Sequence, residues 1–424
     1  MQTRFDVLII GAGVAGCTAA ILLSQAGWSV ALVEKQRFPR RKVCGECVAA
    51  PNLPLLDALG IGADFDRLAG APLRRVGLFV GDKTLIAAMP NYAHSSHRWG
   101  RALGREHLDT LLLRRAAALG ATVLQPWAVR AVAREGAHHV CRVESLQSGD
   151  TVPLRAAVLI DAHGSWESDP TGEAPRRRPH GSDLFAFKGN FIGAELDVDL
   201  LPVLAFPGGY GGMVLADGGI LTLACCIRRD ALQSIRQRLP GVKAAVAVQG
   251  HLVASCRGVR DALRTARQKG AWLSVGPIRP GIRARARSPS EFAIGNAAGE
   301  AHPILGEGIS MAIQSAWLLC DRLIPQYADV TAGRGVAAAG LAYASDWRRS
   351  FAARIRTAAF FSQFAMRPAS AGWVWPLLRR WPGILTAGAR LGGKVTCVVA
   401  SSAVQTNTDS AKGLPDMTVQ REPK

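Results

Sequence analysis

The chain has 424 residues, of which 49% are hydrophobic and 20% are charged. This length is enough for two or three packed domains, and the low charge content excludes a disordered chain or a coiled coil. Lys and Arg outnumber Asp and Glu by 51 to 32. The summed field therefore attracts anionic partners, such as a nucleotide cofactor, an acidic carrier protein, a lipid surface or nucleic acid.

The sequence also indicates where the protein resides. The best candidate for a membrane span, residues 383–400, is interrupted by Arg390 and Lys394, so a spanning helix is not expected. The N-terminus starts with a strand pattern rather than with a secretion signal. Nine cysteines are scattered along the chain, which favours a reducing compartment over a disulfide framework. We expect a cytoplasmic protein, either free or peripheral to the inner membrane.

The first elements predict a nucleotide-binding unit. Residues 5–10 predict a strand, residues 14–26 a helix rich in Ala and Leu, and residues 29–33 a second strand that ends at Glu34. The turn before the helix carries a G-x-G-x-x-G pattern made of Gly11, Gly13 and Gly16. Such glycines allow a tight turn and bring backbone N–H groups and the positive end of the helix against a pyrophosphate. Glu34 is spaced to bind ribose hydroxyls, so we expect a dinucleotide site, and this pattern fits NAD and FAD equally.

The middle of the chain predicts mostly strands. In chain order we expect a hairpin from residues 74–80 and 84–89, an amphipathic helix at 104–119, strands at 121–125 and 128–146, and a buried strand that enters a glycine loop at 158–164. Residues 183–226 are strand-like and rich in glycine, and helical periodicity returns at 230–239 and 242–253.

The last part predicts one more strand and then helices. Residues 289–299 predict a strand entering a second glycine loop, and a helix is expected from Gly308 to about residue 325. From residue 335 to about 395 the pattern is helical, with aromatic residues and arginines interleaved. Residues 401–424 are polar and predict a flexible tail.

Four segments stand in an order that resembles one enzyme family. They are the glycine turn with Glu34, residues 40–46 (Arg-Arg-Lys-Val-Cys-Gly-Glu), residues 161–164 (Asp-Ala-His-Gly), and residues 295–299 followed by His302-Pro303 and Gly306-Glu307-Gly308. The order resembles the FAD-dependent oxidoreductases of the para-hydroxybenzoate hydroxylase superfamily, and within it the geranylgeranyl reductase-like branch, which is related to flavin-dependent halogenases. The resemblance spans residues 1–325.

The resemblance implies an α/β fold: a Rossmann-like FAD-binding domain, an inserted β-sheet substrate domain and a C-terminal helical region. We expect the FAD-binding domain at residues 1–75, 100–175 and 276–330, the substrate domain at 76–99 and 176–275, the helical region at 331–400 and the flexible tail at 401–424.

The same resemblance implies where FAD is bound. Gly11, Gly13 and Gly16 would hold its pyrophosphate and Glu34 its adenosine ribose. Arg105 would lie near the flavin phosphate and ribityl chain, and Lys42 and Asp161 belong to the second and third family segments.

The second glycine loop departs from the family pattern at one position. Gly295 and Asn296 match a Gly-Asp segment whose aspartate binds a ribityl oxygen, and Asn296 keeps an acceptor but not the charge. Pro303, Gly306 and Gly308 precede a helix whose N-terminus would stabilise negative charge on the reduced flavin.

Three side chains are candidates for the reaction itself. Cys44 matches a family Cys-Gly segment beside flavin and substrate, and with Cys47 it forms a C-x-x-C, whose alternatives are a redox pair and unreactive buried thiols. Tyr210 falls where geranylgeranyl reductases contact lipid, although the rest of that motif is missing. His302 has a pKa suited to a proton donor, and a hydrogen-bonded surface histidine is the alternative. No second ligand pair with metal spacing accompanies the cysteines, so no metal site is expected.

Phe206 and Trp272 are expected either to line the substrate cavity or to pack in a core. The halogenase motif Trp-x-Trp-x-Ile-Pro is absent from the middle of the chain, which disfavours halogenation.

These parts fit more than one mechanism. A monooxygenase or oxidase acting on a hydrophobic aryl, polyketide or isoprenoid molecule is slightly favoured, because the lipid-contact motif is degraded while the flavin segments persist. The alternatives are a flavin-dependent C=C reductase of the geranylgeranyl reductase type and a non-catalytic electron-transfer flavoprotein. NAD(P)H or a partner protein would supply the electrons.

Arginines and tryptophans recur between residues 348 and 381. They predict a basic, aromatic surface, which would serve an acyl carrier protein or a membrane, or else belong to helices packed on the FAD domain. No nucleic-acid-binding module is present in the sequence, so nucleic acid is not an expected partner.

Overall fold

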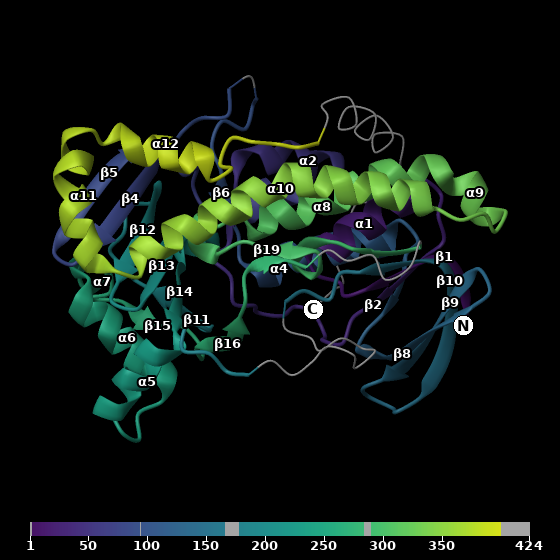
Figure 1. The fold of residues 1–424 in the computed structure, drawn as a ribbon, viewed down its shortest axis with the longest axis horizontal. Helices are drawn as coiled ribbons and strands as arrows, with labels where there is room; N and C mark the ends of the chain where they lie inside the picture. Colours follow the sequence, from purple (N-terminus) through teal and green to yellow (C-terminus); the bar gives the residue numbers. More distant parts are fainter. Residues whose placement is uncertain (1, 94, 166–177, 284–289, 400–424) are drawn as a thin grey trace, which may run out of the picture.

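The computed structural model describes residues 2–93, 95–165, 178–283 and 290–399. Two sheets stand side by side, and the helices that end the described chain run along one side of both (Figure 1). Among the described residues, no helix is both long enough and apolar enough to cross a bilayer.

The first sheet is the predicted nucleotide-binding sheet. Its strands run in the order β7-β2-β1-β10-β9-β8, with β18 also paired to β10. The strands next to β1 are parallel to it, whereas β8 and β9 form an antiparallel hairpin at one edge. Their bounds are β1 (Arg4–Ile10), β2 (Val30–Val33), β7 (Thr122–Leu124), β8 (Trp127–Glu135), β9 (His138–Ser145), β10 (Thr151–Asp161) and β18 (Glu291–Ala293).

Three helices cover one face of this sheet because they are apolar where they meet it. α1 (Val14–Gln25) is buried along most of its length and packs between α4 (Arg105–Ala118) and α8 (Gly308–Leu323). Shorter elements complete this body: β3 (Cys47–Val48), η1 (Ala50–Asn52), α2 (Leu53–Ala58), α3 (Gly62–Leu68), β6 (Arg101–Ala102), β17 (Gly281–Ile282), η3 (Gly295–Ala297), β19 (Gly299–Glu300), η4 (Pro303–Leu305), η5 (Ile324–Gln326) and α9 (Tyr327–Thr331).

The second sheet is largely antiparallel and is inserted between pieces of the first body. Its order is β15-β11-β14-β13-β12-β4-β5, with β16 also paired to β11. Helices α5 (Arg229–Arg238), α6 (Ala244–Ser255) and α7 (Arg257–Ala262) enclose a separate apolar core with it. The strands are β4 (Arg75–Val80), β5 (Lys83–Ala88), β11 (Leu184–Ile192), β12 (Leu200–Phe206), β13 (Gly209–Leu215), β14 (Leu221–Arg228), β15 (Arg267–Gln268) and β16 (Leu273–Ile278), and η2 (Asp217–Gly219) joins β13 to β14.

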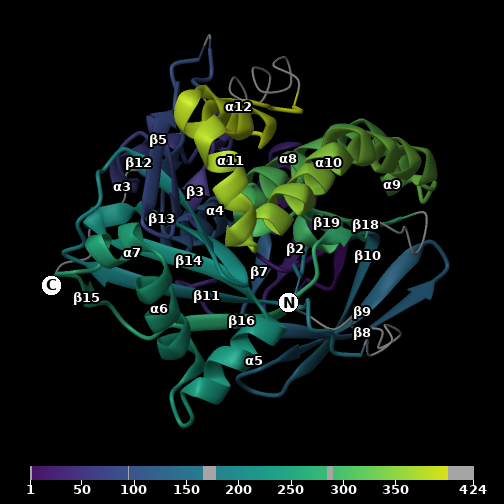
Figure 2. The same cartoon turned by 60° about the vertical axis from the view of Figure 1, so that its left-hand side comes forward.

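The C-terminal helices bridge the two bodies. α10 (Ala337–Ala365) packs against α8 at one end and against β12 and β13 at the other, while α12 (Gly383–Leu391) lies on β4 and β5. α11 (Pro368–Arg380) joins them, and Figure 2 shows α11 and α12 above the second sheet. These helices therefore close one side of the junction between the sheets.

The predicted α/β fold class is confirmed, and the structure differs from the sequence prediction in detail. The single strand expected at 128–146 is the hairpin β8–β9, because Gly136 turns the chain at φ +61°. The second sheet also extends past the expected boundary at residue 275, since β16 runs to Ile278. The predicted tail, 401–424, lies outside the described residues.

Candidate flavin and substrate site

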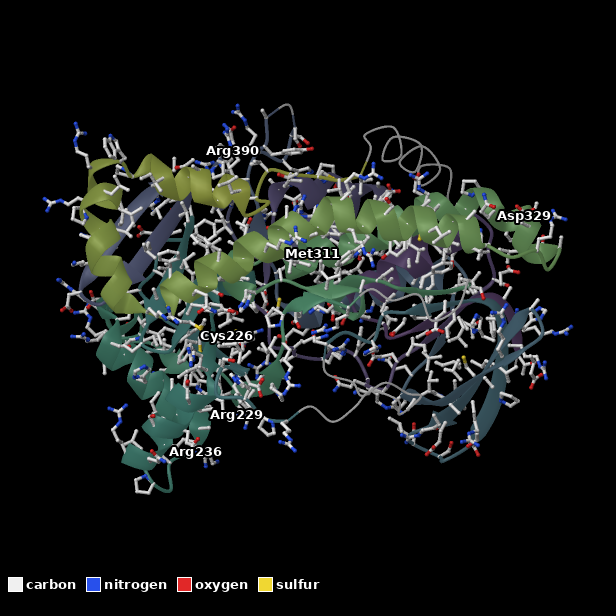
Figure 3. The ribbon with its side chains drawn as sticks, in the orientation of Figure 1. Cys226, Arg229, Arg236, Met311, Asp329 and Arg390 are labelled. Atoms are coloured by element: carbon white, nitrogen blue, oxygen red, sulfur yellow. The ribbon has the colours of Figure 1, made fainter. Side chains whose placement is uncertain are left out.

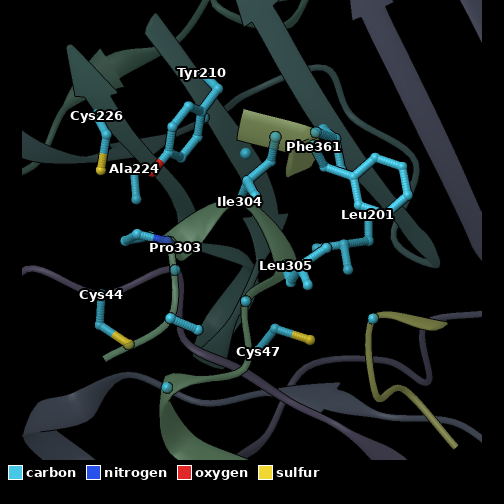
Figure 4. A pocket seen from close by; sticks show the side chains of 18 of the residues that line it. Cys44, Cys47, Leu201, Tyr210, Ala224, Cys226, Pro303, Ile304, Leu305 and Phe361 are labelled. Carbon is cyan, nitrogen blue, oxygen red and sulfur yellow. The ribbon is translucent and has the colours of Figure 1, made fainter. Parts of the chain in front are cut away.

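A cavity of about 620 Å³ lies where the two sheets and the C-terminal helices meet. Its walls come from the glycine turn after β1, the Cys44–Cys47 loop, the inner face of β4, β12, β13 and β14, the loop before α8, and α10 to α12. Most lining side chains are apolar, and Figure 4 shows Leu201, Ile304, Leu305 and Phe361 pointing into the space beneath Tyr210. A cavity of this size and lining can hold an apolar small molecule.

The glycine turn has the geometry that its sequence predicts. Gly11 has φ +98°, and a Cβ there would lie 2.7 Å from the carbonyl oxygen of Ala162. A Cβ on Gly16 would lie 1.9 Å from the carbonyl oxygen of Gly11, so both positions exclude a side chain. Gly13 immediately precedes α1 and lines the cavity. The positive end of α1 is thus open to a ligand phosphate.

Three cations gather beside this helix end. A Cβ on Gly13 would lie 4.0 Å from Nη2 of both Arg40 and Arg105. Burial, together with these two arginines, lowers the pKa of Lys42 to about 8. Arg105 donates to Asp109 at 2.6 and 2.8 Å. Burial opposes the charge of Arg105, yet Asp109 and Cys44 together raise its pKa overall. Nε of Arg40 is buried and lacks a hydrogen-bond partner among the described residues. This excess of buried donors fits a pyrophosphate.

Glu34 lies at the end of β2, as predicted. Its carboxylate accepts the backbone N–H of Ala12 at 3.0 Å and that of Gln36 at 2.8 Å. Arg40 lies 3.4 Å from the same carboxylate. Glu34 is therefore fixed next to the glycine turn, where a ribose hydroxyl of a bound dinucleotide would find an acceptor.

The second glycine loop holds Asn296 in a defined orientation. Its Nδ2 donates to Ser165 at 2.8 Å and to Glu300 at 3.1 Å. Glu300 is buried and is paired with Arg283 at 2.9 Å. Because Nδ2 is engaged, Oδ1 of Asn296 is left to accept a hydroxyl hydrogen from the ribityl chain. Gly295, at φ +57°, lets the loop pass within contact of α1, since a Cβ would lie 2.9 Å from that of Ala15.

Asp161 ends β10 and contributes indirectly. Its carboxylate pairs with the Nδ1 of His163 and accepts the backbone N–H of His163 at 3.2 Å. Ala162 and Gly164, rather than Asp161, line the cavity. Asp161 thus shapes the loop that packs against the glycine turn.

The loop before α8 faces the cavity as the prediction requires. Pro303, Gly306 and Gly308 line the cavity, and Gly306 is left-handed at φ +62°. Between them Glu307 is buried, 3.4 Å from the Nζ of Lys394 and 3.7 Å from Nη1 of Arg354. Burial opposes the charge of Lys394, yet Cys47 and Glu307 raise its pKa overall. The C-terminal region thus fixes the start of α8, where the positive helix end would meet the flavin.

Two of the predicted catalytic residues form a pair. Tyr210 lines the cavity, and its hydroxyl lies 3.2 Å from Nδ1 of His302. Burial and Cys226 raise the pKa of Tyr210, and burial lowers the pKa of His302 to about 4. Both groups are therefore neutral near pH 7. His302 itself lines a second, polar cavity of about 420 Å³, whose walls include Asp183, Arg228 and Arg279.

The third predicted catalytic residue, Cys44, lies across the cavity from Tyr210 (Figure 4). Cys44 and Cys47 are both free thiols, and both line the cavity. Burial raises the pKa of Cys47, which is the opposite of the shift that activates a redox thiol. The two cysteines of the C-x-x-C pattern accordingly form part of the cavity wall.

Sequence reasoning missed the role of Glu46, a buried acid with three partners at the site. Glu46 has φ +59° and is 2% exposed. Its carboxylate pairs with the buried Lys188 of β11, accepts the hydroxyl of Thr222 at 2.5 Å and accepts the backbone N–H of Arg105 at 2.9 Å. It joins the cysteine loop to the second sheet and to the start of α4. One signal was available: Lys188 is the single charged residue in a strand whose other residues, apart from Asn190, are apolar or glycine.

Of the two roles left open for Phe206 and Trp272, the structure shows core packing. Neither lines the cavity; Phe206 is fully buried in the core beneath the second sheet, and Trp272 packs against that core. Away from the cavity, Glu106, His107 and Asp217 bring ligand atoms within 4.8 Å of one another. There His107 is already paired with Asp217 at 3.2 Å.

Comparison with known proteins agrees with this geometry. Residues 4–171 match the family described as FAD binding domain (FAD_binding_3). A menaquinone reductase of Mycolicibacterium smegmatis is 25% identical over 338 residues, which cover 76% of each chain. The flavin-dependent brominase Bmp2 has the same fold with a TM-score of 0.72 at 20% identity, covering 97% of this chain and 98% of that one.

A second solved structure links the fold to the predicted branch. A geranylgeranyl bacteriochlorophyll reductase-like protein from Thermoplasma acidophilum has a TM-score of 0.66 at 18% identity, covering 95% of each chain. The match of residues 4–171 to an FAD-binding domain, the reductase relative and the shared fold of these flavoproteins all agree with the resemblance found in the sequence.

Proposed function

We propose that the chain is an FAD-dependent oxidoreductase that reduces a C=C bond of a large apolar substrate, of the isoprenoid or isoprenoid-quinone class. The observation that carries the proposal is the apolar cavity that joins the FAD site to the Tyr210–His302 pair. The size of this cavity favours an enzyme over an electron-transfer flavoprotein. The relative from Mycolicibacterium smegmatis, which spans 76% of the chain, is itself called a reductase.

Different residues of the chain would bind the cofactor and the substrate. Arg40, Lys42, Arg105 and the start of α1 would bind the pyrophosphate, and Asn296 would bind the ribityl chain. FAD, when bound, supplies hydride chemistry, and NAD(P)H or a partner protein would reduce it. The apolar walls hold the substrate and exclude water.

Reduction also needs a proton on the second carbon of the bond. Tyr210 is protonated and faces the cavity, so it can give its hydroxyl proton to that carbon as it takes one from Nδ1 of His302. Nε2 of His302 would recover a proton from solvent in the polar cavity that His302 lines. The transfers are coupled, so no charged tyrosine or histidine has to persist in a buried site.

Oxygen insertion, which the sequence slightly favoured, is the second candidate. The specific observation in its favour is the same apolar lining, since oxygen-activating flavin chemistry also requires a dry cavity. Oxygen insertion would, however, leave the Tyr210–His302 pair without a role in the reaction.

Product mass distinguishes the two. The FAD-loaded protein is incubated with isoprenoid-chain quinones, with dithionite or NAD(P)H as donor, with and without oxygen, and in D₂O. After the quinone ring has been reoxidised, we expect a product that forms without oxygen, whose isoprenoid chain has gained two hydrogens and carries deuterium at the carbon that Tyr210 protonates. Tyr210→Phe should lower the rate at least tenfold while FAD content is unchanged. A product that forms only with oxygen and gains an oxygen atom would instead establish the second candidate.

A further inference from the structure

The C-terminal helices present an unusual combination of charge and exposure. Residues 347–399 contain eight arginines and one lysine but no aspartate or glutamate. Arg354 and Lys394 are used internally, against Glu307. Most of the others are exposed, including Arg356, Arg379, Arg380 and Arg390. This segment has no acidic residues of its own that could balance these charges.

The same helices expose large apolar side chains. Phe360 and Phe364, one turn apart on α10, are 60% and 46% exposed, and their ring centroids lie 4.8 Å apart. Trp381, between α11 and α12, is 55% exposed, with the guanidinium of Arg380 5.8 Å from its ring. We call this surface the apolar-basic rim: Phe360, Phe364, Leu377, Trp381, Ile384 and Leu391 together with Arg379, Arg380 and Arg390.

The rim is continuous with the mouth of the cavity. Phe360, Phe364 and Ile384 are exposed and also line the cavity. α10, α11 and α12 pack on one another, so the rim is a single surface carried by neighbouring helices. In Figure 3 Arg390 is labelled at the outer edge of α12, above the second sheet. An apolar molecule that crosses the rim enters the cavity without first being exposed to water.

We propose that the apolar-basic rim docks on the surface of an anionic lipid bilayer. Exposed aromatic and aliphatic side chains insert at the level of the headgroups, and adjacent arginines pair with lipid phosphates. Charge complementarity selects this occupant, because a segment with nine cations and no acids is repelled by a second copy of itself. That the substrate enters through the rim rests on the proposed function; bilayer docking does not.

The test is flotation of the full-length, FAD-loaded protein with vesicles of phosphatidylcholine, alone or mixed with phosphatidylglycerol. We expect binding to the mixed vesicles that weakens as salt is raised. Arg379→Glu/Arg380→Glu and Trp381→Ser/Leu391→Ser should each lower the bound-to-free ratio at least tenfold. None of these four residues lines the cavity.

Matched controls lie on the far helices of the second sheet. Arg236→Glu/Arg238→Glu on α5 makes the same charge change, and Val246→Ser on α6 alters a side chain that is 51% exposed. Both should bind like the parent protein.

The proposal would be overturned if the protein bound neither kind of vesicle, or if the control variants lost as much vesicle binding as the rim variants. It would also be overturned by dimerisation that the Trp381→Ser/Leu391→Ser variant abolishes, or by binding of an acidic acyl carrier protein at the rim without vesicle binding. Because flotation needs no turnover, its result is independent of whether the proposed reduction occurs.

Discussion

The buried pair of Glu46 and Lys188 makes a sharp test of how the site is assembled. Both side chains are 2% exposed, and the pair joins the cysteine loop to β11 of the second sheet. Lys188→Met removes the cation and leaves the Glu46 carboxylate buried without its counter-ion. Breaking a buried pair from one side costs about 3–5 kcal/mol. Glu46 retains the hydroxyl of Thr222 and the N–H of Arg105, which favours the lower half of that range.

The measurement is a double-mutant cycle of urea unfolding, followed by tryptophan fluorescence. Glu46→Gln alone leaves Lys188 charged and unpaired, whereas Glu46→Gln combined with Lys188→Met leaves no buried charge. We expect the double variant to be more stable than the sum of the single changes predicts, by at least about 2 kcal/mol. Thr222→Val, which removes one hydrogen bond to the carboxylate, should cost about 1.5–3 kcal/mol.

A coupling energy near zero would refute the view that this pair ties the two bodies together.

Three further predictions concern the cofactor turn and the proton pair. Gly16→Ala places a Cβ 1.9 Å from the Gly11 carbonyl oxygen and should abolish FAD retention, measured as flavin absorbance per chain. The control Gly250→Ala, where a Cβ meets nothing within 4 Å, should retain FAD like the parent protein. Because the pKa of Lys42 is lowered to about 8, FAD affinity from fluorescence titration should be constant below that pH and fall above it as the cation is lost. Lys42→Met should bind more weakly, and a pH dependence unchanged from the parent would contradict this role. Burial lowers the pKa of His302 from 6.5 to about 4, so between these pH values the unfolded state binds one more proton than the folded state, and thermal stability should fall as the pH drops from 6.5 to about 4. The His302→Asn variant should show a smaller fall in thermal stability, and a slope equal to that of the parent would contradict the burial of a neutral His302.

The sequence predicted best where the backbone itself carries the function. Gly11, Gly13 and Gly16 lie at the turn expected of them, because a glycine requirement comes from local sterics that a short pattern records. Tyr210 and His302 were each proposed separately, but nothing in the sequence indicates that these residues, 92 positions apart, come within 3.2 Å of each other. The role of Phe206 stayed open between cavity and core, because an aromatic residue on a strand can face either side of the sheet, and only the register decides which.

Ion pairs made by three buried acids explain why the rest of the site escaped prediction and also why it forms at this junction. Glu46 with Lys188 ties the cysteine loop to the second sheet, Glu300 with Arg283 ties the Asn296 loop to the end of β17, and Glu307 with Lys394 ties the start of α8 to the end of the described chain. Each of these acids lies within or beside a glycine-containing segment that resembles the flavin-binding family. The base that pairs with each acid comes from another part of the chain. A buried charge is tolerated only where a group of opposite charge lies next to it. The three pairs therefore make the cavity walls depend on correct docking of both sheets and the C-terminal helices, which couples the apolar-basic rim to the geometry of the cavity.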